Sequence, residues 1–454
     1  MCHGRTIAPV KTAQLLEGPI LPTLLRLSVP NVINVVSVAA LITFDGIFMG
    51  RLGGDALAGA SLVFPFVIAA QHLAASGMGG AVSSAIARAL GAGDQARAKE
   101  LAAHAVALAV LLAAATTCVM LALGPSLYRL MGGSGEMLAA AVRYSTVVFS
   151  GAISLYLLNI LASVVRGTGD MTRPALALAA GIAGHVLLSP LLIFGLGPFP
   201  RMGIAGAALG LVVSFGIAAS YLFLHLRGAA SPLVPEFAGA RWRWTHFREF
   251  LRVGVPGMVN VAMNNMSIAI VTGVMAYLGR DAQLGYALGA RLEYIVIPLA
   301  FVFGSALVAM VGTNWGAGKR ARARAIAWTG GMLAGGACGA VGLAAAIFPQ
   351  AWMRLYATEP AVIEAGALYL RIAGPCYALF GFGQALYFAS QGFGNPLPAV
   401  LANVARLALS AVGAWIAVVA FGAGALVVFA GIAAGFALYA ALNAMLLERA
   451  APGA

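Results

Sequence analysis

Charged residues are scarce in this chain of 454 residues, at 9% against about 25% in soluble proteins. The shortage runs along the whole length, while hydrophobic residues make up 61% of the chain and its mean hydropathy is +0.94. This composition excludes a soluble globular domain and predicts a helical protein with many membrane spans. The 57 glycines fit this class, because small residues allow transmembrane helices to pack closely.

Cysteines are also few, and no two of the four form a CxxC pair. Cys118, Cys338 and Cys376 fall in apolar stretches, and Cys2 precedes all of them. Neither a disulfide framework nor a zinc site is therefore predicted. We expect no metal and no organic cofactor.

Acidic residues are outnumbered, with 14 Asp and Glu against 27 Lys and Arg, for a net charge of +13. In a soluble protein this excess would suggest nucleic acid, but here we expect no such partner because membrane topology explains it. About two thirds of the basic residues belong to the termini and the even-numbered loops of the twelve spans described next. The positive-inside rule therefore predicts that both termini are cytoplasmic.

Twelve apolar stretches predict an all-α polytopic membrane protein with twelve transmembrane helices. They lie at about 24–48, 57–87, 101–123, 138–165, 174–195, 203–226, 250–277, 284–313, 324–348, 364–390, 398–420 and 424–447. The longest polar interruption holds Arg241, Arg243 and Arg248 among Trp242 and Trp244, which favours an interfacial linker. The predicted parts are an N-terminal tail (1–23), an N-lobe (24–226), this linker (227–249), a C-lobe (250–447) and a C-terminal tail (448–454).

The two halves of the chain resemble each other. LLRLSVPNVINVV (24–36) aligns without gaps on FLRVGVPGMVNVA (250–262), which superposes Pro30 on Pro256 and Asn34 on Asn260. Further along, RGTGDMTRPA (166–175) falls on QGFGNPLPA (391–399). Each half has an even number of spans, so the repeats are parallel, and we expect two six-helix bundles with a cavity near the midplane.

Asp45 is the one acid inside the first apolar stretch. It lies about 9 Å inside Arg51 at a rise of ~1.5 Å per residue, so the sequence places a carboxylate within the membrane. Such a group is costly unless neutral, paired or facing water, which favours a functional role. The alternative is an aspartate that snorkels or makes a local hydrogen bond. The second half has Val271 at the aligned position, so we expect cation chemistry in the N-lobe.

The ordered motifs resemble those of a known family. The series LLRLSVP, DGIFMGRLGGDALAGASL, ARALGAGDQARAKE and RGTGDMTRPA is similar to multidrug and toxic compound extrusion (MATE) transporters, and among them to the DinF-like branch. This resemblance implies a V-shaped pair of six-helix lobes that exports drugs or metabolites in exchange for H⁺ or Na⁺. It also implies that Asp45 is the cation-binding acid.

The chain departs from the pattern of these relatives in the fifth helix. They usually carry an Asn and an Asp four residues apart where this chain has His185 and Ser189. In the sixth helix, Leu211 stands where a threonine is often found. Sodium needs several oxygen ligands, whereas proton coupling needs only a group that titrates, and imidazole titrates near neutral pH. The predicted cation-coupling residues are thus Asp45, His185 and Ser189. Protons are favoured over sodium, and Pro30 is the candidate hinge that bends helix 1.

Several polar or adaptable side chains at membrane depth are candidates for a substrate cavity. They are Asn34, Asn159, Asn260, Asn264, Met258, Met263, Glu293 and Gln384. For the amides the competing interpretation is interhelical hydrogen bonding, and for the methionines it is ordinary core packing. For Glu293 one interpretation is that it recognises cationic substrates from the C-lobe. The other is that it forms a structural ion pair with an unidentified Lys or Arg.

The main hypothesis is a cation-coupled exporter of small organic, often cationic or amphipathic, molecules in a bacterial inner membrane, working as a monomer among lipids. A lipid-linked oligosaccharide or lipid flippase is the alternative in the same superfamily, and an intramembrane enzyme is the alternative from another class. An enzyme is disfavoured because Asp45 and Glu293 lie in different halves and form no cluster. The glycine-rich loops at Asp94 and Asp170 lack a phosphate-loop ending, so we interpret them as tight turns.

Overall fold

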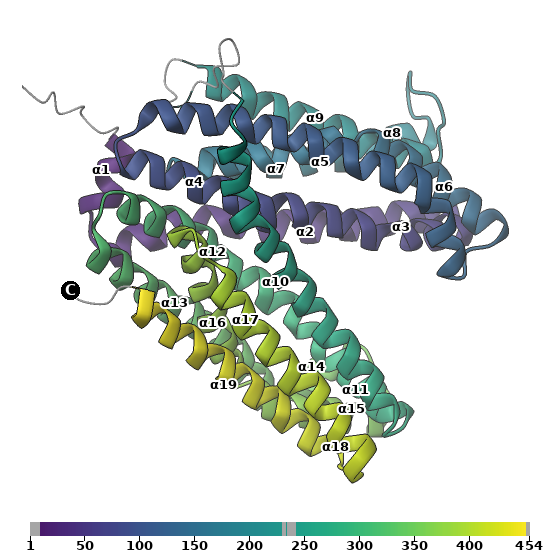
Figure 1. Cartoon of the computed structure of the whole chain (residues 1–454). Helices are drawn as coiled ribbons and strands as arrows, with labels where there is room; N and C mark the ends of the chain where they lie inside the picture. The colour runs from purple at the N-terminus through teal and green to yellow at the C-terminus, as the bar shows by residue number, and fades with distance from the viewer. Residues whose placement is uncertain (1–9, 229–232, 234–241, 451–454) are drawn as a thin grey trace, which may run out of the picture. The chain divides into compact units, whose positions relative to one another are not determined.

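The computed structural model describes residues 10–228, 233 and 242–450. Cys2, Arg241 and the outer ends of both predicted tails, 1–9 and 451–454, lie outside the described residues. Within the described part of the chain every regular element is a helix, and no strand occurs (Figure 1). The predicted all-α fold class is confirmed.

Contacts divide the described chain into two compact units. The first unit contains residues 10–11 and 29–254, and the second contains residues 12–28 and 255–450. The helices that begin before residue 240 are α1 (Val10–Glu17), α2 (Ile20–Leu52), α3 (Gly54–His72), the π-helix η1 (Leu73–Met78), α4 (Gly79–Gly91), α5 (Gln95–Leu130), α6 (Gly135–Ser150), α7 (Ala152–Gly167), α8 (Thr172–Phe194) and α9 (Ile204–Arg227).

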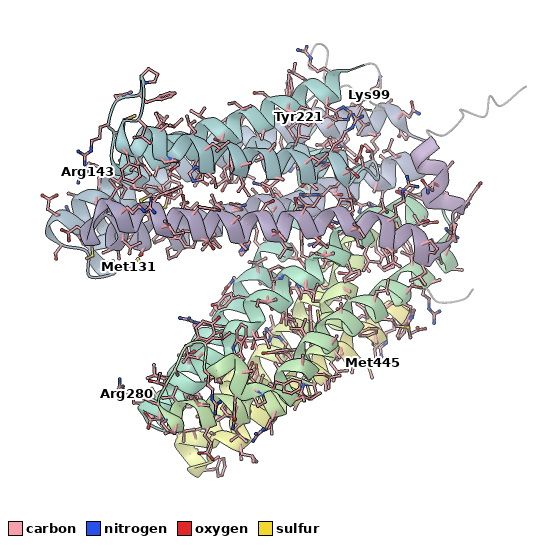
Figure 2. All side chains as sticks on the ribbon, turned by 180° about the vertical axis from the view of Figure 1, so that it is seen from behind. Lys99, Met131, Arg143, Tyr221, Arg280 and Met445 are labelled. Atoms are coloured by element: carbon pink, nitrogen blue, oxygen red, sulfur yellow. The ribbon has the colours of Figure 1, made fainter. Side chains whose placement is uncertain are left out.

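The later helices are α10 (Trp244–Ala276), α11 (Arg280–Gly289), the 3₁₀-helix η2 (Ala290–Leu292), α12 (Glu293–Gly316), α13 (Arg320–Ile347), α14 (Pro349–Met353), α15 (Pro360–Ala373), α16 (Tyr377–Phe393), α17 (Leu397–Leu407), the π-helix η3 (Ala408–Val412), α18 (Gly413–Phe421) and α19 (Ala425–Ala450). Figure 2 shows the side chains on these helices, with Lys99 and Arg143 toward opposite ends of the first unit.

Each of the twelve predicted stretches coincides with a helix or with a run of consecutive helices. Ten described helices are long and apolar enough to cross a membrane, or eleven if α6 and α7 count as one span bent by 47°. The remaining stretch, 364–390, is divided between α15 and α16 by the segment 374–376. Pro375 explains this break, because proline cannot donate the backbone hydrogen bond that a continuous helix needs.

The internal repeat is visible in the backbone at the turns that join the helices. Gly93 and Gly318 have φ of 77° and 74°, and Gly169 and Gly394 have φ of 86° and 81°. These left-handed conformations favour glycine, which explains why the motifs of both halves keep it. Asp94 caps α5 by accepting from the backbone N–H of Arg97 at 2.9 Å. The loop at Asp94 is therefore a helix-to-helix turn, as predicted.

The first long helix of each half passes from one unit to the other. The crossing points fall between residues 28 and 29 in α2 and between residues 254 and 255 in α10. Pro30 and Pro256 lie just beyond these points, inside their helices. Proline weakens helical hydrogen bonding, so both crossing helices carry the same local weakness.

The end of α1, which precedes α2, and the first part of α10 are fastened within the units to which they belong. In the second unit, Asn314 donates its side-chain N–H to the carbonyl of Leu15 at 3.0 Å, and Lys319 donates to the carbonyl of Leu16 at 3.2 Å. In the first unit, Glu249 of α10 accepts from Arg88 and Arg97, each at 2.8 Å. The structured chain therefore begins well before the predicted start of the first span.

The described part of the predicted linker leads directly into α10. The tryptophan side chains there, Trp242 and Trp244, are exposed, which is typical of rings at a membrane interface. The same segment is bonded to α5. The backbone N–H of Arg243 donates to Nε2 of His104 at 3.1 Å, and Nε2 of His246 lies 3.1 Å from Oε2 of Glu100. These contacts fix the start of α10 on α5.

Candidate functional site

Asp45 and His185 meet in the first unit. The distance between Asp45 Oδ1 on α2 and His185 Nε2 on α8 is 2.6 Å. The imidazole is almost fully buried, with 1% of its side chain exposed, while the carboxylate keeps 14%. Two groups that both titrate thus share one hydrogen bond, and one of them is partly accessible.

The close packing of α9 against α8 positions the imidazole. A Cβ at Gly210 would lie 3.2 Å from the Cα of Ser189 and 3.5 Å from Nδ1 of His185. A Cβ at Gly206 would lie 2.6 Å from the carbonyl oxygen of Leu192. Side chains at these two positions would push the helices apart, so glycine allows α9 to hold His185 toward Asp45.

Two buried polar atoms beside this pair have no hydrogen-bond partner in the described part of the chain. Nδ1 of His185 and Oγ of Ser189 are buried and make no hydrogen bond with the described residues. The side-chain polar atoms of Asn34, farther along α2, are also buried without such a bond. Ser189 therefore lies one turn from His185, as predicted, but is not bonded to it or to Asp45. Buried polar atoms normally have hydrogen-bond partners. These atoms are therefore able to bind a water molecule or to take part in proton transfer.

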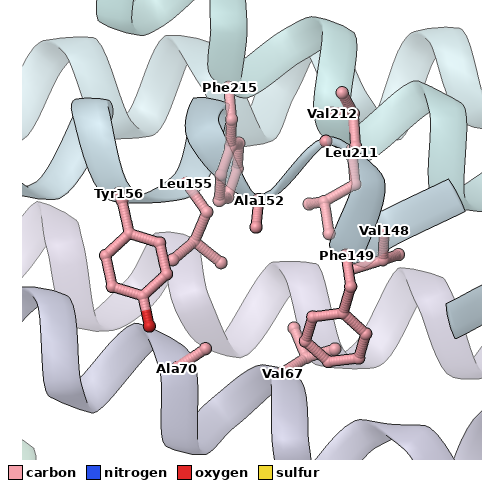
Figure 3. A pocket seen from close by; sticks show the side chains of 11 residues that line it. Val67, Ala70, Val148, Phe149, Ala152, Leu155, Tyr156, Leu211, Val212 and Phe215 are labelled. Carbon is pink, nitrogen blue, oxygen red and sulfur yellow. The ribbon is translucent and has the colours of Figure 1, made fainter. Parts of the chain in front are cut away.

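An apolar recess opens on the other side of α9 (Figure 3). It is shallow, with a cavity volume of about 10 Å³, roughly the space that one water molecule needs. Its lining comes from α3, the junction of α6 and α7, and α9: Val67, Ala70, Val148, Phe149, Gly151, Ala152, Leu155, Tyr156, Leu211, Val212 and Phe215. Leu211, where a threonine was expected from the resemblance, is part of this wall. Helix α9 thus separates an apolar recess from the polar pair.

The second unit contains a different polar cluster, centred on Arg406 of α17. Its Nε donates to Oδ1 of Asn403 at 2.7 Å, and its Nη2 donates to Oδ1 of Asn264 at 3.1 Å. Asn403 in turn donates to Oδ1 of Asn260 at 2.8 Å. The guanidinium is 2% exposed and lies over the rings of Phe380 and Phe436 at 5.7 and 5.8 Å.

Glu293 is held by tyrosines in the same unit. The hydroxyl of Tyr369 donates to Oε1 of Glu293 at 2.6 Å and lies 3.0 Å from the hydroxyl of Tyr377. The charges of Glu293 and Arg406 attract each other, yet no described acid lies within 4.0 Å of Arg406. Glu293 thus has a buried cation near it without a direct ion pair.

The other cavity candidates lie in ordinary packing positions. The side chain of Asn159 donates to the carbonyl of Leu155 in its own helix at 2.9 Å. Gln384 accepts from the hydroxyl of Tyr439 at 3.1 Å. Met258 and Met263 are half-buried on α10. Asn260 and Asn264 are brought together, whereas Asn34 and Asn159 belong to the other unit.

Sequence reasoning missed the partners of Asn260, Asn264 and Glu293. Asn403, Arg406 and Tyr369 were not among the candidates, although they organise the polar interior of the second unit. One signal was present, because Arg406 is a basic residue in the middle of an apolar stretch, and such a residue marks a site by default. Among the described residues, no three His, Cys, Asp or Glu side chains form a group that could hold a metal ion.

Comparison with known proteins decides the family. The MatE family model matches the chain twice, over residues 30–191 and 256–416. The two matches begin at Pro30 and Pro256, which are the positions that the internal repeat superposes. The chain belongs to the MATE family. MATE proteins are transporters, so this chain is a multi-pass membrane transporter rather than an enzyme.

Curated relatives align with most of this MATE protein. A protein named FAD transporter from Shewanella oneidensis is 27% identical over 398 residues, which are 87% of this chain and 87% of the relative. A protein named probable multidrug resistance protein NorM from Thermotoga maritima is 26% identical over 407 residues, which are 83% of this chain and 84% of the relative. These names support an efflux transporter of small organic molecules.

Solved structures show the same fold. The crystal structure of MATE in the bent conformation superposes with a TM-score of 0.89 at 24% identity and covers 98% of both chains. An outward-facing multidrug resistance MATE transporter superposes with a TM-score of 0.87 at 25% identity and covers 97% of this chain and 98% of the other. Two six-helix bundles, predicted from the sequence, are therefore confirmed.

Proposed function

We propose that this MATE protein is a proton-coupled antiporter that exports small organic molecules by alternating access, with Asp45 as the coupling acid. The observation that supports this proposal most directly is the 2.6 Å hydrogen bond between Asp45 and His185. A proton arriving at Asp45 removes the negative charge that this bond involves. The bond then loses its charge-assisted strength, and α2 is released from α8.

The donor set fits a proton better than a sodium ion. Sodium is a hard cation that is held by several oxygen atoms, as are other hard cations. Here an imidazole nitrogen lies against the carboxylate, and Ser189 adds only one hydroxyl nearby. Both Asp45 and His185 can carry a proton, so the pair supplies what proton coupling requires without further ligands.

The apolar recess supports a route from proton to substrate. Its wall includes Leu211 and Phe215 of α9, and the opposite face of α9 contacts His185 and Ser189 through Gly210. A movement of α8 relative to α2 would therefore displace α9, which forms part of the wall of the recess. We propose that the recess widens in another conformation of the transport cycle to receive the apolar part of a substrate and that proton binding closes it again, with Pro30 as the hinge in α2.

The remaining features of the proposal follow from the resemblance and the charge distribution. We place the protein in the DinF-like branch, as a monomer in a bacterial inner membrane with both termini in the cytoplasm. The relatives are named for FAD and for multidrug resistance, which supports small organic molecules as substrates. Glu293, Asn34 and the half-buried methionines remain proposed contributors to the substrate cavity.

Transport by reconstituted protein tests the coupling. Efflux of a fluorescent organic substrate from proteoliposomes is measured under an imposed proton gradient and separately under a sodium gradient. We expect export only with the proton gradient, and we expect Asp45→Asn to abolish it, because an amide cannot exchange a proton. Asp55→Asn is the matched control, since Asp55 lies in the first turn of α3 outside the proposed site.

Each alternative gives a different result. Export driven by the sodium gradient would mean that sodium, not the proton, is the coupling ion. Unimpaired proton-driven export by a folded Asp45→Asn variant would remove Asp45 from the mechanism.

A further inference from the structure

A permanently charged side chain inside a membrane span is unusual. Arg406 lies within the apolar segment Leu397–Phe421 and is 2% exposed. Burying such a cation at the centre of a span costs ~3 kcal/mol or more. It is kept only where partners or a function compensate for that cost.

The partners that surround this guanidinium are neutral amides. Because a guanidinium can only donate hydrogen bonds, the oxygens of Asn403 and Asn264 must face it. Asn403 must then turn its amide nitrogen outward, and this nitrogen donates to the oxygens of Asn260 and Asn264 at 2.8 and 3.1 Å. Arg406 thus fixes the orientation of all three amides.

In this orientation every amide oxygen of the three asparagines already accepts a hydrogen bond, so only N–H donors remain without partners within the described chain. Nη1 of Arg406 and the side-chain nitrogens of Asn260 and Asn264 make no hydrogen bond with the described residues. The nitrogen of Asn260 is fully buried. A set of unused donors around a positive charge complements a group that only accepts and is negatively charged.

The nearest described acid does not fill that role. An oxygen of Glu293 is already held by Tyr369, and the carboxylate makes no direct ion pair with Arg406. Glu293 offsets the charge of Arg406 through space. The rings of Phe380 and Phe436 near the guanidinium keep it in place, so it need not reorganise on binding.

We propose that the Arg406 cluster, which is Arg406 with Asn260, Asn264 and Asn403, binds an anionic group, a carboxylate or phosphate, of the exported substrate. Its substrates are then anionic or zwitterionic rather than purely cationic. In this proposal Glu293 contributes to the cavity by balancing the charge of Arg406 rather than by binding a cation. This proposal rests on the exporter function proposed above.

Equilibrium binding of two dyes with one ring system and opposite charges tests the assignment. Fluorescein carries a carboxylate, and rhodamine 6G is a cation. Their fluorescence anisotropy is measured with purified full-length protein and no ion gradient. We expect Arg406→Gln to weaken fluorescein binding about tenfold or more while rhodamine 6G changes by less than about twofold, which is the selectivity expected when a charge-assisted bond is lost.

Controls separate recognition from folding. Arg371→Gln removes a charge from an exposed position on α15 and should alter neither dye. If Arg406→Gln fails to fold, the double variant Arg406→Gln with Glu293→Gln restores charge balance and should show the same loss of fluorescein binding. Arg406→Lys keeps the charge without the fork of donors and should retain part of the affinity.

Three outcomes would overturn the proposal. Equal loss of both dyes in a folded variant would make the cluster structural. Unchanged fluorescein binding would place the anion elsewhere. Displacement of fluorescein by phosphatidylglycerol from the unaltered protein, but not of the residual binding in Arg406→Gln, would assign the cluster to a lipid headgroup. Because no gradient is applied, failure of proton coupling would leave these results unaffected.

Discussion

The two units carry opposite charges on corresponding pairs of helices. Helices α2 and α10 open the two repeats, and α8 and α17 follow the equivalent turns at Gly169 and Gly394. In the first unit α2 is joined to α8 by Asp45 and His185. In the second unit α10 is joined to α17 by Asn264 and Arg406.

The difference lies in what each junction can change. Asp45 and His185 are both ionisable side chains, they share a single hydrogen bond, and the buried polar atoms Nδ1 of His185 and Oγ of Ser189 have no partner among the described residues. Arg406 keeps its charge at every physiological pH, and several hydrogen bonds hold it. A duplicated fold has thus placed a switchable bond in one copy and a permanent charge in the other.

Removing the permanent charge should have the largest effect on stability. Arg406→Leu deletes the donors that orient Asn264 and Asn403 and leaves Glu293 without its balancing cation. We expect the unfolding free energy to fall by about 3–5 kcal/mol, as for other broken buried charge networks. Thermal unfolding in detergent measures this effect.

The same measurement on Asp45→Asn should show a small change, because that junction has one bond and a partly exposed carboxylate. An equal loss in both variants would contradict the difference between the units.

Altering the hydrogen bond between Asp45 and His185 should affect transport more than stability. His185→Asn keeps a side chain that can donate to Asp45 but cannot titrate. A charge-assisted hydrogen bond contributes about 1.5–3 kcal/mol, so we expect proton-driven export to fall roughly ten- to a hundredfold. The pH profile of export should also change, because the ionisable imidazole is lost.

Efflux rates from proteoliposomes between pH 5.5 and 8.5 supply the measurement. A folded His185→Asn variant with the profile of the unaltered protein would restrict His185 to a packing role.

Spacing between α8 and α9 should have an intermediate effect. Gly210→Ala places a methyl group 3.2 Å from the Cα of Ser189, and such overpacking costs about 1–3 kcal/mol. Export should decline with it, because His185 is displaced from Asp45. Gly184→Ala is the matched control, since its Cβ would be 3.4 Å from Oγ of Ser214. Equal effects of the two substitutions, by thermal unfolding and efflux, would show that close helix packing at Gly210 does not position His185.

The smallest predicted effects distinguish two serines on the corresponding helical segments. Ser410 donates to the carbonyl of Arg406 at 2.8 Å and lies 3.4 Å from Oγ of Ser267, whereas Oγ of Ser189 has no described partner. We expect Ser410→Ala to cost about 1 kcal/mol and Ser189→Ala to cost less than half of that in thermal unfolding. A larger loss for Ser189→Ala would mean that water or a proton path engages its hydroxyl.

The sequence was sufficient where motifs or periodicity are local. Apolar stretches predicted the helices, and the repeat predicted two bundles. Asp45 stood out as the one acid in the first apolar stretch, and His185 was found through the resemblance. It was insufficient where partners are distant, as for Asn264 and Arg406, which are separated by 142 positions. An asparagine in an apolar stretch looks the same whether it bonds its own helix, as Asn159 does, or orients an arginine.

The crossing of α2 between the units has a consequence for biosynthesis. Residues 12–28 are synthesised long before the rest of the unit in which they pack, which consists of residues from 255 onward. Leu15 and Leu24 are buried in the same core as Leu307 and Ala385, which leave the ribosome much later. The start of the chain must therefore wait for the second half to be translated. Two halves expressed separately and divided at the linker would each hold a segment that belongs to the other.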